Sequence, residues 1–450
     1  MDTNHYSRRQ FIGTVSATSL AAVGTTSLFA GVSMVKSPEK LAILGGEPVR
    51  KNKSWPQWPY RDEKVVDAVV KTTRSGIWCR IQSKTGTVPT FEKDFAALMG
   101  TKFCVATGSG TQALHTCVES FGIGPGDEVI TSPLTDPGTI SSILTSRALP
   151  VMVDVDLKTF QMDPNEIEKK INSNTKALMP VQMGGQCCDM DRIMAIAKKH
   201  KLIVIEDSCQ AALDEYKGKK AGTIGDIGCF SFQSSKTIAC GEGGAIIGND
   251  EEMMDKCFTF HNHGTSRSGH TEVGGPKYRM NEFQAAVLLG QMEGVKERLA
   301  RRRENGLYLN AKLKDFPGIT PQKLYDGDSG AFYLYMMTYH KEHFNNASRE
   351  TFLKALAAEG ISLSKYIPNG LHKEPWTKHI LTQKVYQQMF ASARLQKFSN
   401  ELVLPNCDSV LNNIVMIWAS GPLCATKADM DDIVNAIMKV DDNRDKLNSI

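Results

Sequence analysis

Residues 202–210 read Leu-Ile-Val-Ile-Glu-Asp-Ser-Cys-Gln, four apolar residues followed by two acids. A short apolar run rich in β-branched residues predicts a buried strand. The carboxylate of Asp207 follows at the end of the run, where burial is costly unless the charge has a partner. That partner could be a cationic ring nitrogen, a helix N-terminus or a metal. The stretch therefore predicts either a functional acid or a helix cap at the end of a core strand.

Similar apolar runs occur on both sides of this stretch, with helical patterns between several of them. The expected strands are 103–107, 128–132, 150–154, 177–181, 202–206, 228–232 and 245–248. The expected helices between them are 111–121, 165–171 and 190–200. Strand–helix–strand order of this kind predicts an α/β fold, a mainly parallel sheet sandwiched by helices. Ligands should then bind at the C-terminal ends of the strands.

The C-terminal third has a different pattern. A long helix is expected from residue 281 to about 310, followed by an α+β unit with strands near 331–339 and 414–419 and a helix through 430–440. We therefore expect a large domain with an N-terminal arm at 37–295 and a small C-terminal domain at 296–450.

The composition is that of a globular protein, because 41% of the 450 residues are hydrophobic and 23% are charged. The 53 basic residues nearly balance 49 acidic ones, and no block of like charge predicts a nucleic-acid partner. The eleven cysteines include no CxxC pair or Cys/His spacing typical of zinc. We expect buried free thiols and no metal.

The N-terminus has the pattern of a targeting segment. Ser-Arg-Arg-Gln-Phe-Ile at 7–12 is followed by a mildly apolar stretch without charge up to residue 35. Residues 1–36 resemble a twin-arginine signal, whose export machinery carries folded proteins. The expected location is the periplasm, with the signal cleaved or kept as an anchor; if the signal is not used, the protein stays in the cytoplasm.

A glycine-bearing turn, Thr-Gly-Ser-Gly-Thr at 107–111, follows the first expected strand and opens a helix. Free backbone N–H groups and the helix dipole at such a turn favour a phosphate. A plain tight turn has the same pattern.

A lysine stands between an expected strand and a second glycine turn. Residues 230–236 are Phe-Ser-Phe-Gln-Ser-Ser-Lys, and 241–244 are Gly-Glu-Gly-Gly. Lys236 is either a surface residue or, in a dry cleft, a nucleophile able to form a Schiff base. A phosphate turn, an acid for a ring nitrogen and a Schiff-base lysine are together the parts that a pyridoxal phosphate site requires.

The order and spacing of these parts resemble the DegT/DnrJ/EryC1/StrS aminotransferases, which are fold-type I enzymes that use pyridoxal phosphate. The resemblance covers about residues 41–440 and begins with Leu-Ala-Ile-Leu-Gly-Gly-Glu-Pro-Val-Arg at 41–50. The other matching motifs are 91–92, 109–114, 206–211, 225–232, 241–244 and Tyr-Arg-Met-Asn-Glu-Phe-Gln-Ala-Ala at 278–286.

The resemblance implies a role for each matching residue. Lys236 would hold the cofactor covalently and later move a proton, Asp207 would pair with the pyridine nitrogen, and Gln210 would contact the ring hydroxyl. The residues implied at the phosphate are Ser109, Gly110, Thr111 and Ser231. A homodimer is implied as well, with the loop at 278–281 reaching in from the second subunit.

The chain departs from the family's pattern at three positions. Asp136 stands where an aromatic residue usually stacks on the ring, Gln182 where many members have His, and Lys277 where an Asn lies near the phosphate. Lys277 could bind the phosphate as a cation. The candidate substrate residues are Gln182, Tyr278, Arg279, Tyr366 and His372.

The resemblance implies transfer of an amino group from glutamate or glutamine to a keto-sugar or keto-cyclitol. Lys236 favours transamination, because related sugar 3-dehydratases carry His at this position. A pyridoxal phosphate-dependent dehydratase or lyase, and a non-catalytic sensor that binds the cofactor, stay open as alternatives. Export favours a ketone that is not attached to a nucleotide.

Overall fold

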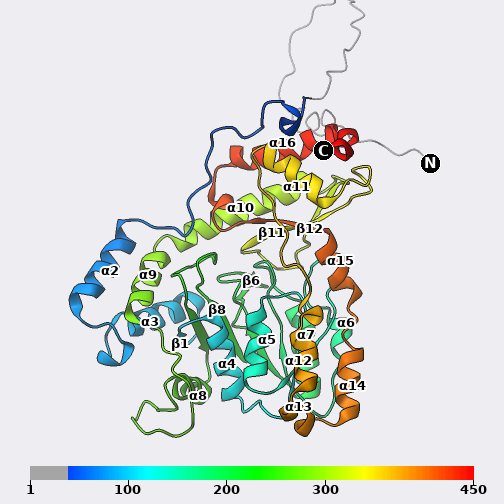
Figure 1. Ribbon diagram of the computed structural model, residues 1–450. Coiled ribbons are helices and arrows are strands. Elements are labelled where there is room, and N and C mark those ends of the chain that lie inside the picture. Colours follow the sequence, from blue (N-terminus) through cyan, green and yellow to red (C-terminus); the bar gives the residue numbers. More distant parts are fainter. Residues whose placement is uncertain (1–38) are drawn as a thin grey trace, which may run out of the picture.

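The computed structural model describes residues 39–450 and contains a seven-stranded central sheet (Figure 1). The strands lie in the order β1-β9-β8-β5-β4-β2-β3. They are β1 (Phe103–Thr107), β2 (Glu128–Thr131), β3 (Leu149–Met152), β4 (Thr175–Met179), β5 (Ile203–Asp207), β8 (Ile227–Ser231) and β9 (Gly244–Gly248). Only β9 runs antiparallel to its neighbours in this sheet. The predicted mainly parallel sheet is confirmed.

Helices cover both faces of this sheet, because successive side chains of each strand point to opposite sides. In β5, Ile205 packs in a core with helices α4, α5 and α8, whereas Val204 packs in another core with α7. The covering helices are α3 (Thr87–Met99), α4 (Gly110–Ser120), α5 (Pro137–Thr145), α6 (Pro164–Ile167), α7 (Met190–His200) and α8 (Glu251–His261). Helix α6 is shorter than the expected helix over 165–171.

The prediction of a single helix from 281 to 310 is wrong. Two helices, α9 (Glu282–Met292) and α10 (Val295–Leu313), replace it. Gly294 lies between them with φ +66°, a left-handed conformation that breaks the helical hydrogen-bond series and that glycine adopts without steric cost.

A second unit lies above the large sheet in Figure 1. Its antiparallel sheet consists of β10 (Ile319–Pro321), β11 (Leu334–Tyr339) and β12 (Ile414–Trp418). Helices α10, α11 (Arg349–Ala358) and α16 (Lys427–Asp442) pack with it in one apolar core. An α+β unit therefore follows the large sheet, as expected.

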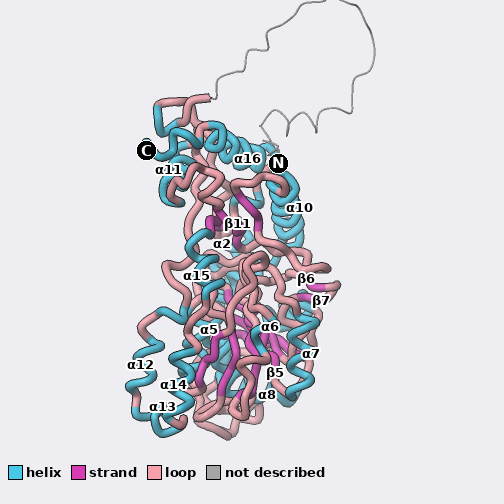
Figure 2. Tube along the Cα trace, turned by 90° about the vertical axis from the view of Figure 1, so that its right-hand side faces the viewer, coloured by secondary structure: helices cyan, strands magenta, loops and turns pink. Residues whose placement is uncertain are grey.

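The packing crosses the boundary expected at residue 295 in two places. Arg50 from the N-terminal arm forms ion pairs of 2.6 and 2.9 Å with Asp429 and Asp432 on α16. Conversely, helices α12 (Trp376–Thr382), α13 (Lys384–Met389) and α14 (Ser392–Asn400) return to the large sheet, where Figure 2 shows them along its side. Arg394 on α14 there binds the buried Glu128 of β2.

Two further α-helices and a hairpin belong to these two units. They are α2 (Glu63–Ser75), α15 (Pro405–Asn413) and the small hairpin of β6 (Glu215–Tyr216) and β7 (Lys219–Lys220). The predicted signal at 1–36 lies outside the described residues. Within residues 39–450, no helix combines the length and the apolar character needed to cross a membrane.

Candidate active site

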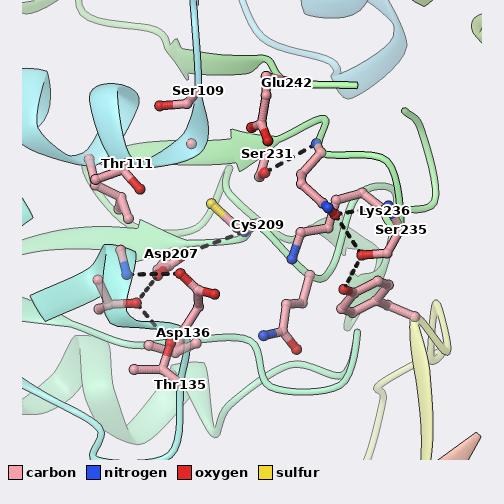
Figure 3. A pocket seen from close by; sticks show the side chains of 18 of the residues that line it. Ser109, Thr111, Thr135, Asp136, Asp207, Cys209, Ser231, Ser235, Lys236 and Glu242 are labelled. Atoms are coloured by element: carbon pink, nitrogen blue, oxygen red, sulfur yellow. Dashed lines mark hydrogen bonds between the residues drawn. The ribbon is translucent and has the colours of Figure 1, made fainter. Parts of the chain in front are cut away.

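A cavity of about 310 Å³ opens at the C-terminal ends of β1, β2, β4, β5 and β8, the edge at which a ligand is expected (Figure 3). The residues lining it include Ser109, Gly110, Thr111, Asp136, Asp207, Gln210, Ser231 and Lys236, together with Thr135, Thr139, Cys209, Gln233, Ser235, Glu242, Tyr333 and Trp418. All the predicted cofactor-binding residues except Lys277 therefore lie in one cavity.

The glycine turn forms an anion cradle at the N-terminus of α4. Ser109 caps this helix, since its hydroxyl accepts the N–H of Gln112 at 3.2 Å. A Cβ on Gly110 would lie 2.7 Å from the Cβ of Ser231, so only glycine lets the end of β8 approach the first turn. The hydroxyls of Thr111 and Ser231 border the same cavity. Backbone N–H groups, hydroxyls and a helix dipole together suit a phosphate group.

Asp207 is a buried acid in the wall of the cavity, with 3% of its surface exposed. Its carboxylate accepts a hydrogen bond from the hydroxyl of Thr139 at 2.7 Å and from the N–H of Cys209 at 3.2 Å. Burial raises the pKa of Asp207, and these two hydrogen bonds partly oppose that rise. Turns rather than a helix follow β5, so Asp207 is not a helix cap.

Lys236 is half-buried and its amine lies in the cavity rather than at the outer surface. Its backbone is held on both sides, because its N–H donates to the carbonyl of Gln233 at 2.8 Å and its carbonyl accepts from the indole of Trp58 at 3.0 Å. Nζ lies 4.4 Å from the centre of the Tyr333 ring. Figure 3 shows Lys236 and Asp207 facing the same hollow from opposite sides.

Gln210 connects the cavity to a residue of the second unit. Its amide oxygen accepts from the N–H of Gly184 at 2.9 Å, and its amide nitrogen donates to the hydroxyl of Tyr366 at 3.1 Å. Burial raises the pKa of Tyr366. Tyr366, a predicted substrate residue, thus adjoins the site through Gln210.

Asp136 stands at the N-cap of α5, and its carboxylate accepts the N–H of Gly138 at 2.8 Å. It keeps an exposed position on the cavity wall. The aromatic rings that line the described cavity belong instead to Tyr333 and Trp418.

Gln182 and His372 do not line this cavity, and the substrate role expected for them stays a prediction. Gln182 is buried, donates to the carboxylate of Glu206 at 3.0 Å and accepts the N–H of Cys188 at 2.6 Å. His372 is also buried, with Nε2 3.2 Å from the carboxylate of Asp408. The side chain of Gln182 is held by these two hydrogen bonds, and that of His372 lies beside a partly exposed carboxylate.

The segment from Lys277 to Arg279 also lies outside the cavity of its own chain. The carbonyl of Tyr278 accepts the N–H of Gly108 at 2.8 Å, and its hydroxyl lies 3.0 Å from Nδ1 of His115. Arg279 donates to Asn262 at 3.1 Å. The action of this segment in the site of a second subunit stays a prediction.

Several cavity residues were not predicted. Ser235 is next to Lys236 in the sequence, so proximity alone could have suggested it. Thr139, Tyr333 and Trp418 carry no such signal, because α5, the residue before β11 and the end of β12 reach the cavity only in the folded chain.

The chain is similar to known aminotransferases over most of its length. Residues 59–412 match the model of the DegT/DnrJ/EryC1/StrS aminotransferase family. An L-glutamine:2-deoxy-scyllo-inosose aminotransferase of Streptoalloteichus tenebrarius is 34% identical over 424 residues, which cover 90% of this chain and 98% of that protein. A GDP-perosamine synthase of Caulobacter vibrioides is 38% identical over 294 residues, covering 65% and 79% of the two chains.

Solved structures extend the likeness to the fold. The crystal structure of 3-amino-5-hydroxybenzoic acid synthase superposes with a TM-score of 0.76 at 26% identity, covering 86% of this chain and 98% of the other. The expected fold-type I architecture, with its mainly parallel sheet and small antiparallel sheet, is confirmed.

Proposed function

Because the chain belongs to the DegT/DnrJ/EryC1/StrS aminotransferase family, we propose that it transfers an amino group from glutamine or glutamate to a keto-sugar or keto-cyclitol. The observation that carries this proposal is the convergence of the Lys236 amine, the buried Asp207 carboxylate and the α4 anion cradle on one cavity. These groups lie at or after the ends of three separate strands, β8, β5 and β1, and meet only in the folded chain.

We propose pyridoxal phosphate as the cofactor, because its three chemical features each find a suitable group. The cradle at Ser109, Gly110 and Thr111 fits the phosphate, Asp207 fits a protonated ring nitrogen, and the Lys236 amine fits the aldehyde. Bound pyridoxal phosphate supplies an aldehyde that reacts with amines and a ring that accepts electrons from the substrate carbon.

The chain's own residues then have distinct tasks. Lys236 would hold the aldehyde of the bound cofactor, and its Nζ would carry a proton to or from the reacting carbon. Asp207 provides a fixed negative charge in a site with little water, where charge acts more strongly than in solution. Thr139 holds that carboxylate in place.

The charge of the cavity supports an acceptor that is not attached to a nucleotide. The described residues lining it include three carboxylates, Asp136, Asp207 and Glu242, against one cation, Lys236. A nucleoside diphosphate would bring further negative charge beside these groups. A free keto-cyclitol or keto-sugar avoids this cost, and the S. tenebrarius relative is named for such an acceptor.

We further propose that the enzyme is a homodimer in which the loop at 278–281 reaches into the site of its partner, with Lys277 near the phosphate there. This segment lies outside the cavity of its own chain and pairs with the turn that follows β1, and this position supports the proposal.

Export by the twin-arginine pathway is proposed from the pattern at residues 7–35 alone. Fractionation of cells that express the full chain tests it. The parent protein should reach the periplasm, whereas a variant with Arg8→Lys and Arg9→Lys should stay in the cytoplasm. Equal distribution of the two proteins would refute export by this route.

The test of the main proposal is an absorbance spectrum of the full chain supplied with pyridoxal phosphate, beside Lys236→Ala. We expect a visible band that disappears when glutamine or glutamate is added, and an altered band in the variant. A band that persists with every amino donor, while a ketone loses a hydroxyl group, would favour the dehydratase or lyase instead. A band with neither reaction would favour a sensor.

A further inference from the structure

The amine of Lys236 has an aromatic neighbour that its sequence position does not reveal. Nζ lies 4.4 Å from the centre of the Tyr333 ring, within the range of a cation–π contact. Among residues 39–450, Nζ has no hydrogen bond and no ion pair. The ring face of Tyr333 is therefore its direct contact in the described chain.

The ring of Tyr333 is fixed in this orientation by its own contacts. Its hydroxyl lies 2.7 Å from Oγ of Ser235, and Ser235 in turn donates to the amide oxygen of Gln233 at 2.7 Å. Because an amide oxygen only accepts, the proton of Ser235 points to Gln233, and Tyr333 must donate to Ser235. Trp418 packs edge-on against the ring at 5.9 Å, and only 4% of Tyr333 is exposed.

These contacts place the ring where it can act on the lysine in each reaction cycle. Transamination requires the Lys236 amine to leave the cofactor, remain nearby and carry a proton before it reattaches. A flexible ammonium with no fixed acceptor would drift toward water. The preoriented ring attracts the ammonium form without binding it as tightly as a carboxylate would.

We propose that Tyr333 is a positioning residue that holds the released ammonium of Lys236 against its ring face, ready to donate its proton and return to the cofactor. This inference rests on the proposed aminotransferase function. Ser235 acts on the lysine only through Tyr333, because its bond to the hydroxyl fixes the rotation of the ring.

Other charges also act on the amine. Asp207 and Cys209 interact electrostatically with Lys236, and Asp136 and Glu242 line the same cavity. All four groups stay unchanged when Tyr333 is replaced, and a comparison of Tyr333→Phe with Tyr333→Leu, both of which lack the hydroxyl, isolates the effect of the ring.

The first test measures the Lys236 amine in the full chain without cofactor. The protein is treated with an acylating reagent between pH 7 and 11, and the labelled peptide is quantified by mass spectrometry, with the exposed Lys93 as internal reference. Only the neutral amine reacts, so the midpoint of the rate against pH gives its pKa. Tyr333→Phe keeps the ring and Tyr333→Leu removes it.

We expect the Leu variant to lower the midpoint by about half a unit to one unit, a roughly three- to tenfold faster labelling at neutral pH. The Phe variant keeps the ring but loses its bond to Ser235, so its midpoint should lie between those of the parent and the Leu variant. Should the Leu variant fail to fold, Tyr333→Met replaces it. A purely steric role would change the maximal rate and leave the midpoint unmoved. Equal midpoints in the parent and the ring-free variant would overturn the inference.

A second measurement separates this inference from the proposed function. The same proteins are loaded with pyridoxal phosphate, and the band is followed after glutamine is added. A parent that reacts, combined with an unchanged labelling midpoint, refutes the role of Tyr333 and leaves the aminotransferase intact. A parent that never binds the cofactor refutes the function, and with it the proposed role of the ring.

Discussion

Thr139 donates a hydrogen bond of 2.7 Å to the buried carboxylate of Asp207, and this bond joins the first turn of α5 to the end of β5. Burial raises the pKa of Asp207, and the Thr139 hydroxyl opposes that rise because it binds the ionised form. The negative charge expected at the cofactor ring therefore depends on a residue that is not itself charged.

Replacing Thr139 by Val should raise the pKa of Asp207 further, so that its carboxylate forms only at higher pH. Since a hydrogen bond to a charged group contributes about 1.5–3 kcal/mol, we expect the rate of the glutamine half-reaction at pH 7 to fall about tenfold or more. The acidic limb of its pH profile should move to higher pH. Thr139→Ser keeps the hydroxyl and serves as the control; a Val variant with the parent profile would refute this role.

Gly110→Ala should weaken cofactor binding, because the added Cβ would lie 2.7 Å from Ser231 and 3.0 Å from the sulfur of Cys209. Either α4 or β8 must then shift, and the cradle widens. We expect an increase in the dissociation constant of pyridoxal phosphate of about tenfold or more, equivalent to at least about 1.4 kcal/mol. Gly274→Ala, which meets nothing within 4 Å, should leave the constant unchanged. Similar dissociation constants of pyridoxal phosphate for Gly110→Ala and Gly274→Ala would contradict the role of Gly110 in the cradle.

The ion pair between Arg394 and Glu128 should contribute to the anchoring of α14 on the large sheet. Glu128 is fully buried and accepts from the guanidinium at 2.6 and 2.9 Å. Arg394→Met leaves that carboxylate without its counterion, and we expect the free energy of unfolding to fall by about 3 kcal/mol in a urea titration.

Lys397→Met is the matched control on the same helix. Lys397 is 60% exposed and lies 3.7 Å from Glu401, so its loss should change the free energy of unfolding by less than about 1 kcal/mol. If both variants lose equal stability, the buried pair has no special importance.

Asp328 should make the protein less stable as the pH rises. Burial and the neighbouring Asp214 raise the pKa of Asp328 to about 10. The folded state therefore holds this proton more tightly than the unfolded chain, whose Asp has a pKa near 3.9. The resulting stability is complete below about pH 4 and is lost progressively as the pH rises toward 10.

Asp328→Asn replaces the protonated acid by a neutral amide, so its free energy of unfolding should fall less between pH 6 and 9 than that of the parent. Urea titrations at several pH values measure this difference. Asp326→Asn, at an exposed neighbouring position, should keep the parent slope. If the free energy of unfolding of Asp328→Asn depended on pH as steeply as that of the parent, the proton would not be held at Asp328.

Complementation between subunits tests the expected role of Lys277. Lys236→Ala and Lys277→Glu should each be inactive alone, the first without the attachment point and the second with an anion near the phosphate. A mixed dimer contains one site with the intact Lys236 of one chain and the intact Lys277 of the other. Co-expression should therefore restore part of the activity; no recovery in verified mixed dimers would show that Lys277 acts within its own subunit.

The central sheet could be predicted because each strand is a short apolar run, and burial favours such runs wherever they occur. The helix over 281–310 could not be bounded in the same way. Its apolar pattern continues past residue 293, and the break depends on the left-handed conformation that Gly294 adopts only in the folded chain.

The site was partly predictable for a similar reason. Asp207 and Ser231 end their strands and Lys236 lies in the loop that follows β8, and the C-terminal ends of parallel strands meet at one edge. Gln182 follows β4 by the same rule, yet its side chain turns into the core to bind Glu206. For a residue that follows the end of a strand, the sequence position does not predict whether its side chain points into the cavity or into the core.

The sequence alone was enough to predict the α/β fold, the family and the expected cofactor-binding groups of the cavity, because hydrophobic periodicity and motif spacing are local properties of the chain. Which groups touch depends on the tertiary structure. The Tyr333 ring reaches Lys236, and Thr139 reaches Asp207, through the packing of the second unit and of α5 against the sheet. Such contacts depend on how separate elements fill space together, and no local pattern in the chain records that outcome.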